Sequence, residues 1–251
     1  MNRTESILKA KYERPPIQEA VCEIRFSMPN PLSKEEIERI QSVWKPEYPI
    51  QQMVAEQSIE VHLALDKVDT KSTPGGNKLI TRSADGKNLA QLGSNFLAIN
   101  RLNPYVGWEE SFRSTILARM EEVQSVYTLE EIHRVGLRYI NKIDFPEANL
   151  RWADWFVMAI PVPGGLGERG GNFQFHFEQQ LDSNVRAVIN FLSLPTTPDS
   201  GTSVILDIDV FCHAKQNINT IRTVLEEIHE PHHMLFEGYL LDKTRELFQI
   251  I

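Results

Sequence analysis

The chain has 251 residues, of which 41% are hydrophobic and 24% are charged, values typical of a globular protein with a core and not of a disordered chain. This length allows one large domain or two small ones. The formal net charge of −8 argues against nonspecific nucleic-acid binding, which requires a basic face.

Cys22 and Cys212 are the two cysteines, and both lie in alternating apolar runs. We expect both to be buried and unpaired, and the lack of a disulfide framework fits a reducing compartment. The first residues carry no apolar signal segment, and no stretch approaches the ~18 apolar residues that span a bilayer. We therefore expect a cytoplasmic protein without membrane contact.

An alternating strand opens the first half of the chain. Residues 19–26 place every second side chain on one apolar face, namely Ala20, Cys22, Ile24 and Phe26. Ser33 then stands three residues before Glu36, the spacing of a capping box. This spacing predicts a helix that continues to about Trp44, because prolines follow at 46 and 49.

Three strands and a long helix are predicted next. The strands lie near residues 52–65, 78–83 and 89–102, with a flexible loop at 71–77 and a turn at Asp85-Gly86. The helix covers about 108–126 and has one apolar stripe, formed by Phe112, Ile116, Leu117, Met120 and Val123.

The second half follows a similar order. Residues 134–143 alternate as a strand, a short helical or irregular piece follows, and strands are predicted at 172–180, 185–192 and 203–212. A helical region runs from about 219 to 248. The glycine-rich segment Gly164–Gly171 lacks the Gly-Lys-Ser/Thr ending of a phosphate-binding loop, so we expect a mobile loop there. The four tryptophans, Trp44, Trp108, Trp152 and Trp155, lie in helical contexts that favour core positions.

These elements predict an α+β fold with an internal duplication. Each half reads as strand, helix, three strands and long helix, with the N-terminal half at 1–128 and the C-terminal half at 129–251. We expect the halves to form one compact unit, in which one antiparallel sheet carries the long helices on one face.

Four segments resemble a sporadically distributed bacterial protein family with a PPxxEAVxEIRF-like signature. The first is Pro15-Pro16-Ile17-Gln18-Glu19-Ala20-Val21-Cys22-Glu23-Ile24-Arg25-Phe26, and the others are residues 103–108, residues 135–141, and the C-terminal Leu235-Phe236-Glu237 with Leu247-Phe248. The family has no assigned activity, cofactor or catalytic residue to carry over. Its patchy distribution implies an accessory gene cluster, of the defence or toxin–antitoxin type.

The segment His229-Glu230-Pro231-His232-His233 matches the His-Glu-x-x-His spacing of zinc hydrolases. In that motif, His229 and His233 would bind the metal from one face of an unbroken helix. Pro231 interrupts the motif, since it lacks an N–H and clashes with the preceding turn. We therefore favour a helix kink or junction with exposed histidines and predict no metal site here.

Asp207 and Asp209 are two positions apart in a predicted strand, so their side chains share one face. Paired carboxylates can hold Mg²⁺ for phosphoryl transfer. The simpler interpretation is the solvated face of a half-buried strand.

Glu23 and Arg138 form a candidate central polar pair. If the two halves superpose on their first strands, Cys22 matches Leu137 and Glu23 matches Arg138. Opposite charges would then occupy equivalent positions near a pseudo-twofold axis. The pair is interpreted either as a cross-strand ion pair that fixes the register of the halves or as a central ligand or partner site.

The sequence favours a non-enzymatic interaction, scaffold or regulatory protein that needs no cofactor. Its partner would be a protein, for instance one encoded by a linked gene, and a homo-oligomer is also compatible. The alternative is a metal-dependent hydrolase or nuclease that uses the C-terminal histidines with Asp207 and Asp209. A nucleic-acid-binding saddle is a third hypothesis, which the net charge disfavours.

Overall fold

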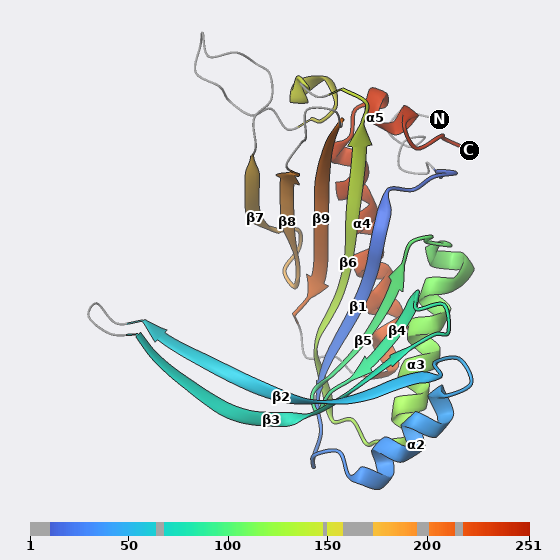
Figure 1. The fold of residues 1–251 in the computed structure, drawn as a ribbon, viewed down its shortest axis with the longest axis vertical. Coiled ribbons are helices and arrows are strands. Elements are labelled where there is room, and N and C mark those ends of the chain that lie inside the picture. Colours follow the sequence, from blue (N-terminus) through green and yellow to red (C-terminus); the bar gives the residue numbers. More distant parts are fainter. Residues whose placement is uncertain (1–10, 64–67, 148–149, 158–172, 195–200, 214–217) are drawn as a thin grey trace.

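Nine strands form one antiparallel sheet, with helices packed against it (Figure 1). The computed structural model describes residues 11–63, 68–147, 150–157, 173–194, 201–213 and 218–251, and describes the backbone alone for 56–63 and 68–76. The strand order is β2-β3-β4-β5-β1-β6-β9-β8-β7, and every pair is antiparallel. The predicted α+β class is therefore confirmed.

The middle strand of the sheet is β1 (Ile17–Ser27), which pairs with β5 (Phe96–Leu102) and β6 (Glu131–Phe145). Its predicted apolar face is buried, with Ala20, Cys22, Ile24 and Phe26 each at most 1% exposed. The remaining strands are β2 (Ile50–Leu63), β3 (Val68–Arg82), β4 (Asn88–Leu92), β7 (Gln174–Gln180), β8 (Val185–Ser193) and β9 (Thr202–Cys212).

The first helix, α2 (Lys34–Trp44), begins at the predicted capping box. The Ser33 hydroxyl accepts a bond from the Glu36 N–H at 3.2 Å, and the Glu36 carboxylate accepts one from the Ser33 N–H at 2.9 Å. These two bonds satisfy N–H groups that have no partner inside the helix. The other helical elements are η1 (Trp108–Phe112), α3 (Arg113–Val126), η2 (Trp152–Asp154), η3 (Ile218–Thr220), α4 (Ile221–Tyr239) and α5 (Asp242–Glu246).

Helices α3 and α4 contact the central strands. Helix α4 packs on β6 and β9, α3 packs on β5, and α2 packs on α3. The predicted long helix starts as the π-helical turn η1, and its predicted apolar stripe is buried. All four tryptophans are also buried, as predicted.

A two-stranded arm formed by β2 and β3 projects from the sheet (Figure 1). The two strands pair along their whole length, whereas β4 pairs only with Leu79–Arg82 of β3. The predicted loop at 71–77 is wrong, because these residues belong to β3. Pro74 lies where β3 has no β4 partner, and its missing N–H therefore interrupts no bond on that side.

The first half contains one strand more than predicted. Residues 89–102 form two strands, β4 and β5, which join through a turn closed by the Gly93 N–H and the Phe96 carbonyl. Four strands thus follow α2, whereas three strands follow β6 in the second half.

Both cysteines are buried and outside any disulfide. Among the described residues, no helix is long and apolar enough to cross a membrane. The predicted loop Gly164–Gly171 lies outside the described residues.

Candidate functional site

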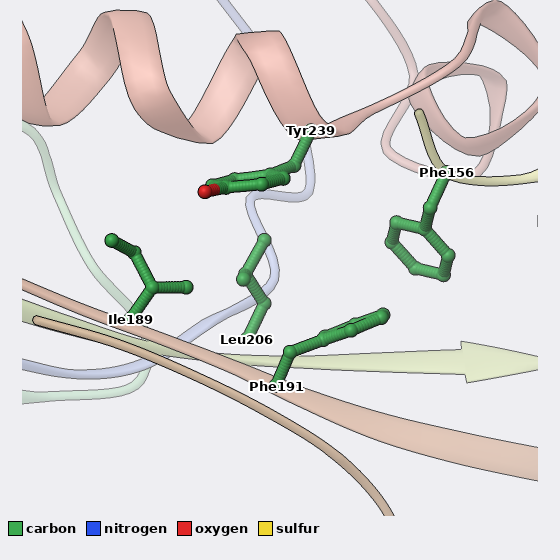
Figure 2. Close-up of a pocket in the computed structure, with 5 residues that line it drawn as sticks. All are labelled: Phe156, Ile189, Phe191, Leu206 and Tyr239. Carbon is green, nitrogen blue, oxygen red and sulfur yellow. The ribbon is translucent and has the colours of Figure 1, made fainter. Parts of the chain in front are cut away.

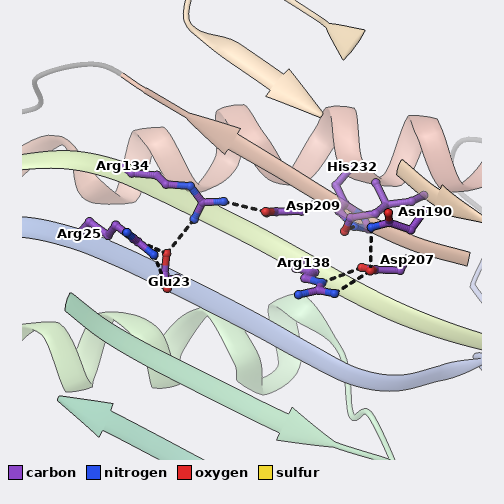
Figure 3. A network of polar contacts seen from close by, with 9 residues as sticks. Glu23, Arg25, Arg134, Arg138, Asn190, Asp207, Asp209 and His232 are labelled. Atoms are coloured by element: carbon purple, nitrogen blue, oxygen red, sulfur yellow. Dashed lines mark hydrogen bonds and ion pairs between the residues drawn. The ribbon is translucent and has the colours of Figure 1, made fainter. Parts of the chain in front are cut away.

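The sheet has two different faces, which follow from the alternation of side chains. One face carries Cys22, Leu137 and Tyr139 and packs against the helices. The opposite side, here called the open face, carries charged residues of three adjacent strands: Glu23 and Arg25 of β1, Arg134 and Arg138 of β6, and Asp207 and Asp209 of β9 (Figure 3). These residues form the candidate site.

Arg134 joins three strands through two carboxylates. Its Nη1 donates to Glu23 Oε1 at 3.1 Å, and its Nη2 donates to Asp209 Oδ2 at 2.7 Å. Arg25 donates to the same Glu23 from Nε at 2.7 Å. The Arg134 side chain is only 15% exposed, so these charged bonds are partly shielded from water. Figure 3 shows Arg134 between its two partners.

Gly136 makes room for the Arg134 side chain. A Cβ atom built on Gly136 would lie 2.3 Å from Arg134 Nη1, far inside contact distance. The Arg134 guanidinium carbon lies 4.6 Å from the centre of the ring of Phe211, which belongs to β9, and this distance is within the range of cation–π attraction. Gly136 thus leaves space for the guanidinium, and Phe211 contacts it.

Arg138 organises a second cluster. Its Nε and Nη2 each donate to a different oxygen of Asp207 at 2.7 Å, a bidentate pair. Asn190 of β8 donates from Nδ2 to Asp207 Oδ2 at 3.1 Å, and its Oδ1 lies 2.7 Å from Nδ1 of His176 on β7. Asp207 is 5% exposed and accepts three hydrogen bonds.

Burial and ion pairing have opposite effects on the pKa values of these charged groups. Burial raises the pKa of Asp209 above its ordinary value, although the neighbouring Arg134 and Arg138 oppose the shift. The hydrogen bond to Asp207 raises the pKa of Arg138, and the bond to Glu23 raises that of Arg25. Both arginines therefore stay charged.

Glu23 and Arg138 lie on the same face, but each has other partners. The β1–β6 register places Cys22 opposite Leu137, so Glu23 faces Gly136 and Arg138 faces Val21. Along the two antiparallel strands, Glu23 and Arg138 therefore lie on opposite sides of the Cys22–Leu137 pair, so they are not cross-strand neighbours. The cross-strand ion pair between β1 and β6 is instead Glu23–Arg134.

The residues of the metal hypothesis do not come together. Asp207 and Asp209 share the open face, as predicted, and there they contact Arg138 and Arg134. The predicted solvated position is wrong for Asp207, which bonds to Arg138 and Asn190 and is only 5% exposed. The histidines belong to α4, on the other side of the sheet. Among the described residues, no group of three or more His, Cys, Asp or Glu side chains could hold a metal ion.

The C-terminal histidines are packing residues. Helix α4 runs without interruption through Pro231, so the predicted junction is wrong, and so is the predicted exposure. His232 is 3% exposed, and its Nε2 lies 2.9 Å from the carbonyl oxygen of Ile208. His229 stacks on Trp108 with ring centres 4.3 Å apart. Burial lowers the pKa of His232 to about 3 and that of His229 to about 4.

A small apolar gap lies between α4 and strands β8 and β9 (Figure 2). It is lined by Phe156, Ile189, Phe191, Leu206 and Tyr239, and it leaves no room for a water molecule. A ligand site usually combines apolar walls with a few converging polar groups. The gap has apolar walls alone, so we interpret it as a packing feature.

The fold and site define an α+β protein with a nine-stranded antiparallel sheet and a charged, cross-linked open face. Comparison with protein-family profiles and with curated proteins found no match.

Proposed function

We propose that the chain is a non-enzymatic interaction protein, a scaffold or regulatory subunit that binds a partner protein across the open face. The observation that carries this proposal is the pairing of the open-face carboxylates. Glu23, Asp207 and Asp209 each bond to at least one arginine. A carboxylate held in this way is a poor metal ligand and a poor general base, because both roles require available lone pairs.

The arginines keep donors for a partner. Arg25 and Arg138 use Nε and Nη2 for their carboxylates, and the described residues give their Nη1 groups no hydrogen-bond acceptor. Their side chains are 56% and 46% exposed. Arginine is enriched at protein interfaces, and a side chain that is already held in place loses little entropy on binding.

The extent of the network also supports a macromolecular partner. Its two clusters together cover five neighbouring strands: the Arg134 cluster lies on β1, β6 and β9, and the Arg138 cluster lies on β6, β9, β8 and β7. Strands lie about 4.8 Å apart, so the network is about 19 Å wide. That width suits a protein surface better than an enclosed small molecule.

The proposal includes an origin by duplication of residues 1–128 and 129–251, which would act as one unit. The strand order supports it, since each half begins with a strand that lies beside the last strand of that half: β1 beside β5, and β6 beside β9. Only β2 has no counterpart among the described strands of the second half. The resemblance to an accessory bacterial family supports a cytoplasmic partner encoded by a neighbouring gene.

Capture of the partner from the native host tests the function. Tagged wild type is compared with Arg25→Glu, which reverses an exposed charge on the open face, and with Lys34→Glu, which reverses one on α2. We expect wild type and Lys34→Glu to capture the same protein and Arg25→Glu to lose it. Equal capture by all three would contradict the proposed face. Stoichiometric metal in protein purified without added metal, lost in Asp207→Asn, would support the hydrolase or nuclease alternative.

A further inference from the structure

Among the described strands, β7 is an edge of the sheet and pairs with β8 on one side only. It is the last strand in the order and the outermost of its wing in Figure 1. Its seven residues pair with β8 without a register shift, from Gln174–Leu192 to Gln180–Arg186. The strand contains no proline, lysine or bulge, three of the devices that prevent edge strands from pairing with another chain.

The outward-facing backbone groups of β7 can be identified. The Ser193 N–H bonds to the Phe173 carbonyl, and the Leu181 N–H bonds to the Val185 carbonyl, at the two ends of the β7–β8 ladder. Hydrogen-bonded residues alternate along an antiparallel pair, so the odd-numbered residues of β7 bond to β8. The even-numbered residues, Gln174, His176, Glu178 and Gln180, therefore direct their N–H and C=O groups away from the sheet.

We propose that the chain forms a homodimer in which two β7 strands pair antiparallel across a twofold axis at Phe177. His176 of one copy then faces Glu178 of the other, and Gln174 faces Gln180. All four positions are outward-facing, so the backbone groups of the two strands can form about eight hydrogen bonds. The two sheets would join into one continuous sheet.

Side-chain complementarity selects this register over its neighbours. An axis at Phe177 creates two identical His176–Glu178 pairs, because a twofold contact repeats each pair. An axis at Glu178 would place two carboxylates directly opposite each other, and an axis at His176 would oppose two imidazoles. Like charges directly opposite each other destabilise a cross-strand pair, and an axis at Phe177 keeps the two Glu178 carboxylates apart.

His176 is already oriented for this contact. Asn190 donates from Nδ2 to Asp207, so its Oδ1 faces the ring, and His176 must donate from Nδ1. Nε2 remains for a polar group of the second copy. The Arg138 cluster of each copy thus reaches the strand at the dimer axis.

The other side of β7 offers an apolar contact. Phe177 is half-buried, pairs in register with Ile189, and has its ring 6.3 Å from that of Tyr239. Ile189 and Tyr239 line the apolar gap of Figure 2. Across the proposed axis, the two Phe177 side chains form a non-hydrogen-bonded pair, the closer of the two antiparallel arrangements. Pairing at this axis would therefore bring the apolar residues between β7 and α4 of one copy next to those of the other copy.

Solution mass tests the dimer. Light scattering coupled to size exclusion should give twice the 28.8 kDa chain mass for wild type at tens of micromolar. Glu178→Pro removes an outward N–H and leaves the bonds to β8, so it should be folded and monomeric. Glu178→Arg should also be monomeric, and Glu227→Arg, an exposed change on α4, should stay dimeric. A monomeric wild type, or a dimer in both Glu178 variants, would overturn the proposal.

Cysteine substitution tests the register. Opposed residues of a non-hydrogen-bonded pair have Cα atoms about 4.5 Å apart, close enough for a disulfide. Phe177→Cys should form a cross-linked dimer on mild oxidation, whereas Phe175→Cys and Gln179→Cys should not, because each lies about 13 Å from its own copy. The native thiols are buried and give little background. Equal cross-linking at all three positions would contradict the axis. Arg25→Glu should leave the dimer intact, so failure of this proposal is distinguishable from failure of the proposed function.

Discussion

Gly136→Ala should break the Arg134 cluster of the open face without disturbing the hydrophobic core. The new methyl group would lie 2.3 Å from Arg134 Nη1, so the guanidinium must leave its position. Because the displaced atoms are the end of a flexible side chain, the backbone can stay in place. The loss of free energy then comes from broken contacts and not from a strained strand.

The magnitude follows from those contacts. Arg134 makes one hydrogen bond to Glu23 and one to Asp209, with carboxylate side chains 28% and 23% exposed. Partly exposed charged bonds contribute about 1 kcal/mol each, and the Phe211 contact contributes about 0.5–1 kcal/mol. Replacing glycine in a strand returns up to about 1 kcal/mol. We expect the free energy of unfolding to fall by about 2 kcal/mol.

Urea unfolding of four proteins measures this coupling: wild type, Gly136→Ala, Arg134→Ala and the double variant. In the Arg134→Ala background, Gly136→Ala should cost nothing, because no side chain remains to be displaced. Gly238→Ala is the matched control, since its Cβ would meet nothing within 4 Å, and it should be neutral or stabilising. An equal loss from Gly136→Ala in both backgrounds would refute the proposed role of the glycine.

Three further predictions concern stability. The pKa values of His229 and His232 are lowered from 6.5 to about 4 and about 3, so the unfolded state takes up protons first as the pH falls. The free energy of unfolding should therefore fall below pH 6.5 by up to about 1.4 kcal/mol per pH unit for each histidine, until about pH 4 for His229 and about pH 3 for His232. Urea unfolding of His232→Gln at several pH values should show a shallower fall, and an unchanged slope would contradict this. Ser33→Ala should lower the free energy of unfolding by about 1 kcal/mol, measured in urea, and no change would show that the cap contributes nothing. The arm can be shortened by replacing residues 56–76 with Asn-Gly, which would join the register partners Ala55 and Asn77 in a tight turn. The thermal transition should stay cooperative and close to that of wild type, because a lone two-stranded ribbon contributes little stability. Loss of the transition would show that the sheet depends on the arm.

Local signals in the sequence predicted local structure well. The capping box at Ser33 and the alternation in β1 depend on neighbours within a few residues, and both are present as predicted. The loop predicted at 71–77 failed for a related reason. Pro-Gly-Gly usually marks a turn, but a strand that lacks a neighbour on one side tolerates proline.

The site depends on register, which composition and spacing do not specify. Arg134 was visible as a charged residue in an alternating strand, yet its partners come from β1 and β9. The role of Gly136 becomes apparent only when the Arg134 side chain is placed over it. The pairing of Glu23 with Arg138 rested on superposition of the halves, and superposition does not determine which residues face each other across an antiparallel pair.

Site-specific photo-crosslinking in the native host tests the central claim most directly. A photoreactive amino acid replaces Arg25 on the open face or, as the control, Lys34 on α2, and both positions are exposed. The account predicts a covalent adduct with one defined protein from position 25 and none from position 34. Adducts with the same protein from position 34 and none from position 25 would contradict binding through the open face.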